Sequence, residues 1–271
     1  FDLSTPVDGN MTLVAAYTLA DGVTAVGDQA GLAAIASAAS GSVYVLTSDI
    51  ALDGWTSVSL PEGVTLVGAG HTLSGLTVPL FSDFGGNNAV KDLTIDANIV
   101  SNADVGAVFA NAKLTAELVR VTVNGTVSTT GKNKAAGGFI GIATGTATLA
   151  FTDCVNNAAV SSVCNGGTNR AGGFIGIDTD AGKTSITVNN CQNTGTVTAT
   201  TTAGGFIGYF YRAGTLDVNG FVNHIGATVR ATGAGGLVGE LASSSSQGTC
   251  KLTAYDVRND AEIIGNKAGG I

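Results

Sequence analysis

The chain has 271 residues, of which 40 are glycine, 44% are hydrophobic and only 12% are charged. The hydrophobic share supports a folded core and excludes a disordered chain, and three prolines without a three-residue glycine period exclude collagen. Twelve basic against twenty acidic residues give a net charge of -8, and no basic run occurs, so we expect no nucleic-acid partner. The long uncharged stretches are rich in Ser, Thr, Asn and Gly, so we expect no membrane insertion of this segment.

The first elements in chain order are irregular. Residues 28–39 are the best helix candidate, with Asp28 as N-cap and Leu32, Ile35 and Ala36 along one face. A helix at this place would cap the open end of a repeat structure. Short apolar and β-branched runs separated by turn residues then predict strands at 43–46, 64–67, 73–78 and 93–95.

A repeat occupies the rest of the chain. The string Gly-Gly-Phe-Ile-Gly begins at positions 137, 172 and 204, recurs as Gly-Gly-Leu-Val-Gly from position 235, and is cut short at 269–271. The starts recur at an interval of about 31–35 residues, and a degenerate copy stands one such interval earlier, at Gly106. A fixed period of this size identifies a repeat architecture.

Each unit alternates β-branched and small residues and contains one asparagine about twenty residues after its glycine pair. These residues are Asn124, Asn156, Asn193, Asn223 and Asn259. The pattern predicts an all-β chain: a right-handed parallel β-helix over 18–271 with about 31–35 residues per coil, irregular coils at 43–105 and regular repeats at 106–271. We expect the five asparagines to form a structural ladder rather than a binding site.

The glycine pairs have a structural explanation as well. They would allow tight corners with positive φ and close approach of neighbouring coils, and no helix or Lys-Ser/Thr follows that would suit phosphate binding. Four cysteines are too few for a disulfide framework; Cys154 and Cys191 are expected as buried neighbours, with a disulfide between them left open, and the thiol or disulfide state of Cys164 and Cys250 is open too.

Catalytic residues are hard to find in this sequence. Asp153, Asp217 and Asp256 precede the asparagine column at offsets of 3, 6 and 3, so Asp217 is expected out of register. His71 and His224 have no Ser, Cys or Asp at motif spacing. We therefore expect no enzyme, no metal and no cofactor. The alternative is a carbohydrate-active β-helix enzyme, a polysaccharide lyase or hydrolase, which would need a carboxylate column facing a groove.

One coil breaks the repeat and suggests a ligand patch. Tyr209, Tyr211 and Arg212 follow one glycine motif, and Asp178 and Asp180 follow the preceding one. Sugars stack on aromatic faces and hydrogen-bond to carboxylate and guanidinium groups, so these five residues predict a glycan site. The alternative is that both tyrosines face the core and Phe210 is exposed.

The sequence also resembles a known family. Residues 44–50, 68–77 and 90–95 are similar to the opening of bacterial β-helix proteins that carry the GLUG motif, and the Gly-Gly-Phe-Ile-Gly repeats resemble that motif itself, so the resemblance spans roughly 43–271. It implies an exported, multidomain surface protein, often adhesin-like. Some such repeats sit beside immunoglobulin-cleaving metallopeptidase domains, although no metallopeptidase His-Glu-x-x-His occurs here.

A second resemblance concerns the first residues. Residues 1–7 and 12–17 are similar to the last third of a Listeria–Bacteroides repeat of the internalin B type, with Tyr17 where Trp is common. Residues 1–17 are therefore expected to be the tail of a β-grasp module or a linker, with further domains of the same chain on both sides. Together these observations predict a secreted or cell-surface, non-catalytic stalk or adhesive module that binds a glycan or a host glycoprotein.

Overall fold

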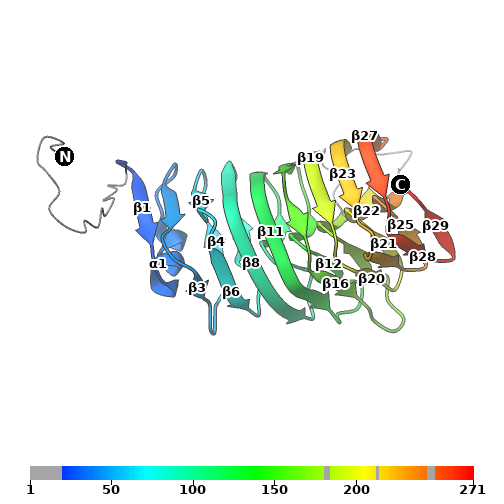
Figure 1. Ribbon diagram of the computed structural model, residues 1–271, viewed down its shortest axis with the longest axis horizontal. Helices are drawn as coiled ribbons and strands as arrows, with labels where there is room; N and C mark the ends of the chain where they lie inside the picture. Colours follow the sequence, from blue (N-terminus) through cyan, green and yellow to red (C-terminus); the bar gives the residue numbers. More distant parts are fainter. Residues whose placement is uncertain (1–19, 180–183, 212–213, 243–247) are drawn as a thin grey trace, which may run out of the picture.

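The computed structural model describes residues 20–179, 184–211, 214–242 and 248–271. The predicted tail at 1–17 lies outside these residues. The described chain winds into stacked coils along one long axis, with the helix at the N-terminal end and the last strands at the other (Figure 1). Each regular coil contributes strands to three sheets in which the paired strands are parallel. The predicted fold class, a parallel β-helix, is confirmed.

The strands sort into three sheets within the described chain. The largest sheet contains sixteen strands: β1 (Val23–Val26), β2 (Val43–Leu46), β3 (Ile50–Ala51), β5 (Thr65–Val67), β6 (Thr72–Leu76), β8 (Asn88–Ser101), β11 (Thr115–Thr129), β14 (Thr148–Thr152), β15 (Val155–Asn156), β16 (Ala159–Ser162), β19 (Ser185–Asn193), β20 (Val197–Ala199), β23 (Thr215–Asn223), β24 (Thr228–Arg230), β27 (Lys251–Asn259) and β28 (Glu262–Ile264). The second sheet contains seven: β4 (Val58–Leu60), β7 (Phe81–Phe84), β10 (Phe109–Ala112), β13 (Ile140–Ala143), β18 (Ile175–Asp178), β22 (Ile207–Tyr211) and β26 (Val238–Ala242). The third contains six: β9 (Val105–Gly106), β12 (Ala135–Gly137), β17 (Arg170–Gly172), β21 (Thr202–Gly204), β25 (Gly233–Gly235) and β29 (Lys267–Gly269).

The length of a coil changes along the axis. Val23 pairs with Val43, Val43 with Thr65, and Thr65 with Ala89, and these registers make the first coils markedly shorter than the later ones. The regular coils have the predicted length, since Ile140 pairs with Ile175, its counterpart in the next glycine motif. The third sheet begins only at β9, and this explains why the glycine repeat is absent from the shorter coils.

A short helical segment covers the first coil. Helix α1 (Gln29–Ala33) begins at Asp28, whose carboxylate accepts a hydrogen bond from the Gly31 amide at 2.7 Å. The segment continues as a 3₁₀ turn, η1 (Ala34–Ser37), so it is shorter than predicted. Leu32 and Ile35 are buried, but Ala36 is exposed, because a 3₁₀ turn brings residues three apart, not four, onto one face.

The core of the regular coils is a column of phenylalanines from the repeated motif. The rings of Phe139, Phe174 and Phe206 stack, with centroids 4.5 and 4.9 Å apart, and all three are fully buried. Phe151 and Phe221 pack edge-on against them from the largest sheet. The aromatic position of the motif therefore joins the sheets across the interior.

The repeated glycines serve close approach of the backbone. A Cβ atom at Gly208 would lie 2.5 Å from the Ala171 carbonyl oxygen, and one at Gly176 would lie 2.9 Å from the Ala136 carbonyl oxygen. These contacts bring the second and third sheets together backbone to backbone. The predicted positive φ is wrong, since the glycine pairs at 137–138, 172–173 and 204–205 do not adopt it. Proximity alone excludes a side chain at these positions.

Candidate functional site

An asparagine ladder runs through the interior of the regular coils. The Nδ2 atom of Asn156 donates to Asn193 Oδ1 at 2.8 Å, Asn193 donates to Asn223 at 2.7 Å, and Asn223 donates to Asn259 at 2.8 Å. Three of these side chains also donate to a backbone carbonyl just beyond their own strand, as Asn193 does to Gly195 at 3.0 Å. The ladder pairs buried amide groups with one another, although Asn156 Oδ1, at the start of the ladder, has no hydrogen-bond partner among the described residues.

The first predicted member of the ladder lies elsewhere. Val123, not Asn124, pairs with Asn156, so Asn124 faces the outer side of the sheet. There it donates to Asp96 at 2.8 Å and accepts from Asn157 at 2.9 Å, in a second, outer column that continues to Thr194. A shift of one residue in a strand reverses the face of the side chain, and spacing counted from the glycine pair does not detect it.

The three candidate catalytic carboxylates do not converge. Asp153 and Asp256 occupy one column, but Asn190 and Gly220 separate them, which places them three coils or about 14 Å apart. Asp217 pairs with Thr187 and Thr253 and lies in another column, as expected. Paired carboxylates in glycosidases are about 5 to 9.5 Å apart, so this arrangement does not supply the carboxylate pair of a carbohydrate-active enzyme.

The histidines have local partners. His71 Nδ1 lies 3.2 Å from Asp49 Oδ1, and His224 Nε2 lies 2.9 Å from Gln192 Oε1. A hydrogen bond from the Thr72 amide, together with the His71 contact, lowers the pKa of Asp49. Among the described residues, no group of three or more His, Cys, Asp or Glu side chains could hold a metal ion.

The four cysteines are free thiols. Cys154 and Cys191 are both buried and lie in register on adjacent coils, as predicted. Contact with the Cys154 thiol and burial raise the pKa of Cys191. Burial also raises the pKa of Cys250. These raised values keep Cys191 and Cys250 in the protonated, unreactive form.

The tyrosines of the predicted patch face outward. Tyr209 and Tyr211 are partly exposed and stack on one another, with ring centroids 5.6 Å apart, whereas Phe210 between them is fully buried. The alternative, with tyrosines in the core and Phe210 exposed, is wrong. Burial raises the pKa of the Tyr209 phenol, and the charge of Arg170 partly opposes that rise.

Arg170 is the residue that sequence reasoning missed. Its guanidinium carbon lies 4.1 Å from the centroid of the Tyr209 ring, in a cation–π contact between the third and second sheets. Its Nε atom is buried and has no hydrogen-bond partner in the described part of the chain. The signal was present in the repeat, because the same place before the glycine pair holds a neutral residue in the coils of Ala135, Thr202 and Gly233 and a cation in those of Arg170 and Lys267.

The remaining predicted patch residues do not join the tyrosines. Asp178 pairs with Ala143, is 1% exposed, and accepts a hydrogen bond from Thr184 Oγ1 at 3.0 Å inside the solenoid. The prediction that it is a ligand-facing acid is wrong, since it is the inward-facing residue that follows Ile177. Asp180 and Arg212 lie outside the described residues.

A groove of about 270 Å³ opens one coil further along. It is lined by Thr201, Thr202, Thr232, Gly233, Gly239, Glu240 and Lys267, and we call it the Thr202 groove. Thr202 pairs with Arg170 in the third sheet, and Glu240 pairs with Tyr209 in the second. The groove therefore lies next to the Arg170–Tyr209 contact, since one lining residue in each of two sheets pairs with a residue of that contact.

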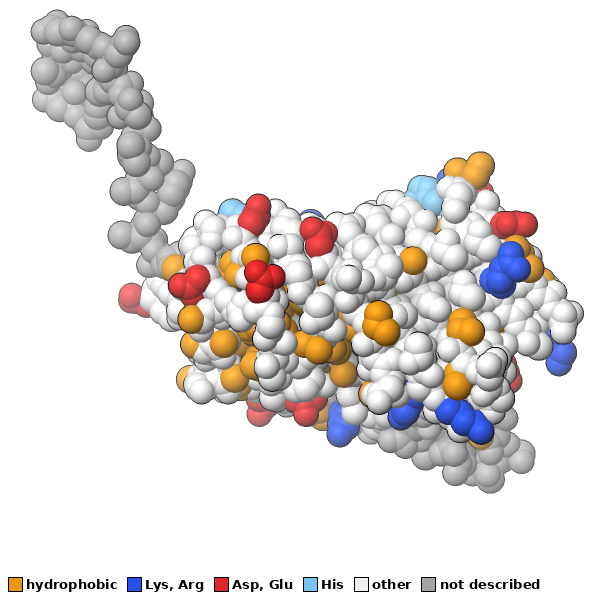
Figure 2. Space-filling view, turned by 90° about the horizontal axis from the view of Figure 1, so that it is seen from below, with side chains coloured by type: hydrophobic (Ala, Val, Ile, Leu, Met, Phe, Trp, Pro, Cys, Tyr) orange, Lys and Arg blue, Asp and Glu red, His pale blue; other side chains and the backbone are white. Residues whose placement is uncertain are grey.

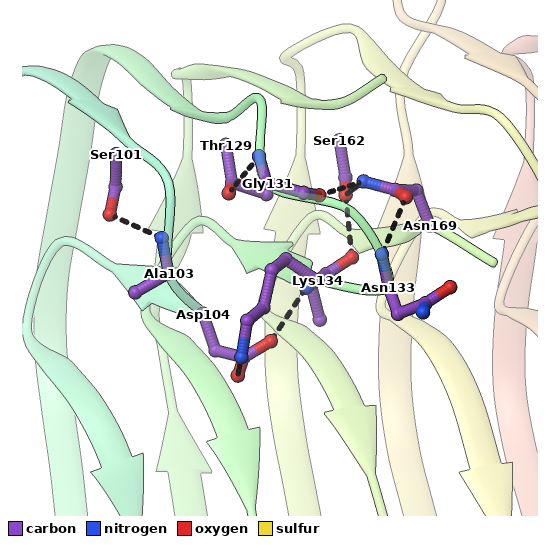
Figure 3. A network of polar contacts seen from close by, with 10 residues as sticks. Ser101, Ala103, Asp104, Thr129, Gly131, Asn133, Lys134, Ser162 and Asn169 are labelled. Atoms are coloured by element: carbon purple, nitrogen blue, oxygen red, sulfur yellow. Dashed lines mark hydrogen bonds and ion pairs between the residues drawn. The ribbon is translucent and has the colours of Figure 1, made fainter. Parts of the chain in front are cut away.

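A buried polar network holds the backbone beside Arg170 (Figure 3). The fully buried Asn169 donates to the Gly131 carbonyl at 2.8 Å and to Ser162 Oγ at 3.1 Å, and its Oδ1 accepts from the Asn133 amide at 3.1 Å. Its own carbonyl accepts from the amide of Thr202 at 3.3 Å. Asn169 thus fixes both Arg170 and the start of β21, so the groove rests on a rigid frame.

Comparison with known proteins identifies the same fold. No protein-family model and no curated protein matches the chain. A solved structure from Bacteroides ovatus, provisionally named an immunoglobulin A1 protease, matches with a TM-score of 0.65 and 17% identity over 91% of this chain and 83% of that chain. A second structure, named IgA1 protease, matches with a TM-score of 0.66 and 15% identity over 92% of this chain. This chain spans only 20% of that second protein.

These names correct one prediction. The expectation that the protein is not an enzyme is contradicted, because these two solved structures of similar fold are named as proteases. At 15% and 17% sequence identity, the structural similarity shows a shared fold and nothing more. No helix in the described residues is long and apolar enough to cross a membrane.

Proposed function

We propose that this chain is the β-helix segment of an exported bacterial protease that cleaves immunoglobulin A1, and that the segment holds the substrate. The observation that carries the proposal is the fold match over nine-tenths of this chain to two proteins that bear this name. A protease with a host immunoglobulin as substrate acts outside the bacterial cell, which agrees with the exported surface protein that the GLUG resemblance implies.

The match to the longer protein supports a segment that holds the substrate rather than one that only links other domains. There, a region of this fold makes up one-fifth of a long polypeptide. A solenoid of stacked coils presents an extended, rigid surface suited to binding a large partner. The adhesive role expected from the sequence is retained here as the hold on a glycoprotein substrate.

Binding of immunoglobulin A1 to the immobilised chain tests the proposal. We expect saturable binding with a Kd of about 10 µM or tighter, and none to an immunoglobulin of another class, since specific recognition on this scale corresponds to about 7 kcal/mol. Equal binding to both classes, or to neither, would contradict a substrate-holding role.

A further inference from the structure

We propose that the Thr202 groove, together with the Arg170–Tyr209 contact and Tyr211, is a binding site for a neutral saccharide. The inference rests on the proposed function only for its biological role, where the saccharide would be part of a glycoprotein substrate. The site itself spans four consecutive coils, marked in the third sheet by Arg170, Thr202, Gly233 and Lys267.

Buried polar atoms without hydrogen-bond partners lie at and beside the groove. Thr202 is 4% exposed, lines the groove, and its Oγ1 atom has no hydrogen-bond partner among the described residues. The buried Nε of Arg170, one coil away, has none either. A buried polar atom without a hydrogen-bond partner costs about 1–3 kcal/mol. A ligand hydroxyl that bonds to such an atom at the groove would recover part of this free energy, so the groove favours a ligand with hydroxyl groups.

An aromatic platform lies beside the groove. Tyr209 and Tyr211 present stacked, partly exposed rings, and the guanidinium of Arg170 holds Tyr209 in place. A sugar ring presents an apolar face of C–H groups that packs on an aromatic ring. The exposed carboxylate of Glu240, adjacent to Tyr209 in the next coil, accepts hydrogen bonds from hydroxyl groups at the rim.

Size and charge select the ligand class. A volume of about 270 Å³ lies just below the range of about 300–1,000 Å³ of drug-sized sites, and so suits one or two sugar rings. The charged residues that line the groove are one acid, Glu240, and one base, Lys267, so neither sign of charge is favoured there. A neutral ligand with several hydroxyl groups uses both signs, whereas a carboxylated sugar would meet Glu240.

Titration of the chain with free saccharides tests this inference separately from the protease. The probes are neutral mono- and disaccharides ending in mannose, galactose or an N-acetylhexosamine, matched acidic saccharides ending in a uronic acid, and an unglycosylated Ser/Thr-rich peptide. Binding is followed by saturation-transfer NMR and calorimetry. We expect at least one neutral saccharide to bind, and to bind better than its acidic counterpart and the peptide.

Variants locate the site. Thr202→Val keeps the shape and removes the hydroxyl, and Glu240→Gln changes only an exposed charge; each should weaken the neutral saccharide about tenfold, the scale of one hydrogen bond to a charged or buried group. Tyr209→Leu should weaken it at least as much. Glu262→Gln and Tyr255→Leu, which change exposed residues outside the groove, are the matched controls and should leave binding unchanged.

Four results would overturn the inference: no saccharide binds, an acidic saccharide binds best, the peptide binds instead, or the controls lose as much affinity as the groove variants. Circular dichroism of every variant separates loss of the site from loss of the fold. Saccharide binding without any binding of immunoglobulin A1 would leave this inference standing and refute the proposed function.

Discussion

In the largest sheet, one column of residues has a positive φ, in the left-handed region of backbone conformation, and the strands bend there. The column contains Asp92, Arg120, Asp153, Asn190, Gly220 and Asp256, with φ between 50° and 87°. Asp, Asn and Gly tolerate this conformation, because a short polar side chain or none avoids the clash. Arg120 is the exception, and its guanidinium is held against Asp92 by two hydrogen bonds.

That ion pair gives a pH dependence with a definite sign. The hydrogen bond from Arg120 lowers the pKa of Asp92 below its usual value of 3.8. The unfolded state therefore binds more protons than the folded state in this range. The stabilisation of the fold by the Arg120–Asp92 ion pair is present above about pH 4 and is lost as the pH falls through the lowered pKa of Asp92. We expect Asp92→Asn to reduce the loss of thermal stability between about pH 5 and 2. Thermal unfolding of both proteins across that range checks this, and identical pH profiles would refute it.

The interior ladder predicts a second effect on stability. Asn193→Ala removes a side chain that accepts from Asn156 and donates to Asn223 and to the Gly195 carbonyl. Asn156 keeps its bond to Ala158, but Asn223 Oδ1 loses its donor in the interior, so the substitution should lower the free energy of unfolding by about 2–4 kcal/mol. Asn124→Ala, in the outer column, should cost about 1 kcal/mol or less. Denaturant unfolding measures both; a larger loss for Asn124 would show that the ladder is not the stabilising column.

The sequence identified four ladder asparagines but could not separate Asn124 from them, because the spacing from the glycine pair to the ladder varies between coils and does not say which face a residue occupies. It also placed Tyr209 and Tyr211 at a candidate site. Arg170 was missed because its partner, Tyr209, lies in another coil and in a different sheet, so only the register of two sheets brings them together. Asp178 was misplaced, since sequence proximity to the motif does not say whether a side chain faces inward.

At the scale of elements, the contact between the second and third sheets depends on residues that have no room for a side chain. The repeat period predicted the regular coils, since strands in register must recur at that spacing. The short first coils were not predicted in length, because their strands pair in the largest sheet without the glycine motif. The helix boundary was also misjudged, because 28–39 ends in a 3₁₀ turn.

A matched pair of substitutions tests the sheet contact. A Cβ at Gly208 would lie 2.5 Å from backbone, whereas one at Gly233 would lie 3.6 Å from its nearest neighbour, Thr202 Cγ2. Neither glycine has a positive φ, so the effect of each Gly→Ala substitution depends mainly on how closely the added Cβ approaches its neighbours. We expect Gly208→Ala to destabilise the fold by about 3 kcal/mol and Gly233→Ala by less than about 1 kcal/mol. Equal midpoints in denaturant unfolding would rule out close packing as the reason for Gly208.

At the scale of the whole molecule, charge is distributed unevenly along the chain. All twelve Lys and Arg residues lie from Lys91 onward, whereas eight of the twenty acidic residues precede it. On the face in Figure 2, acidic side chains gather over the N-terminal coils, and basic ones lie further along the solenoid. The net charge of -8 thus belongs to the part before Lys91, and the later coils with the Thr202 groove are balanced, in keeping with a neutral ligand there.

The most direct test of the central claim uses the natural protein that carries this chain. Immunoglobulin A1 is incubated with that protein and with a variant lacking residues 20–271, and the products are identified by mass. We expect the intact protein to cleave immunoglobulin A1, and the variant to show a KM raised at least about tenfold with a smaller change in kcat, because lost substrate binding appears mainly in KM. No cleavage by the intact protein, or unchanged kinetics without the solenoid, would contradict the claim that this segment holds the substrate of a protease.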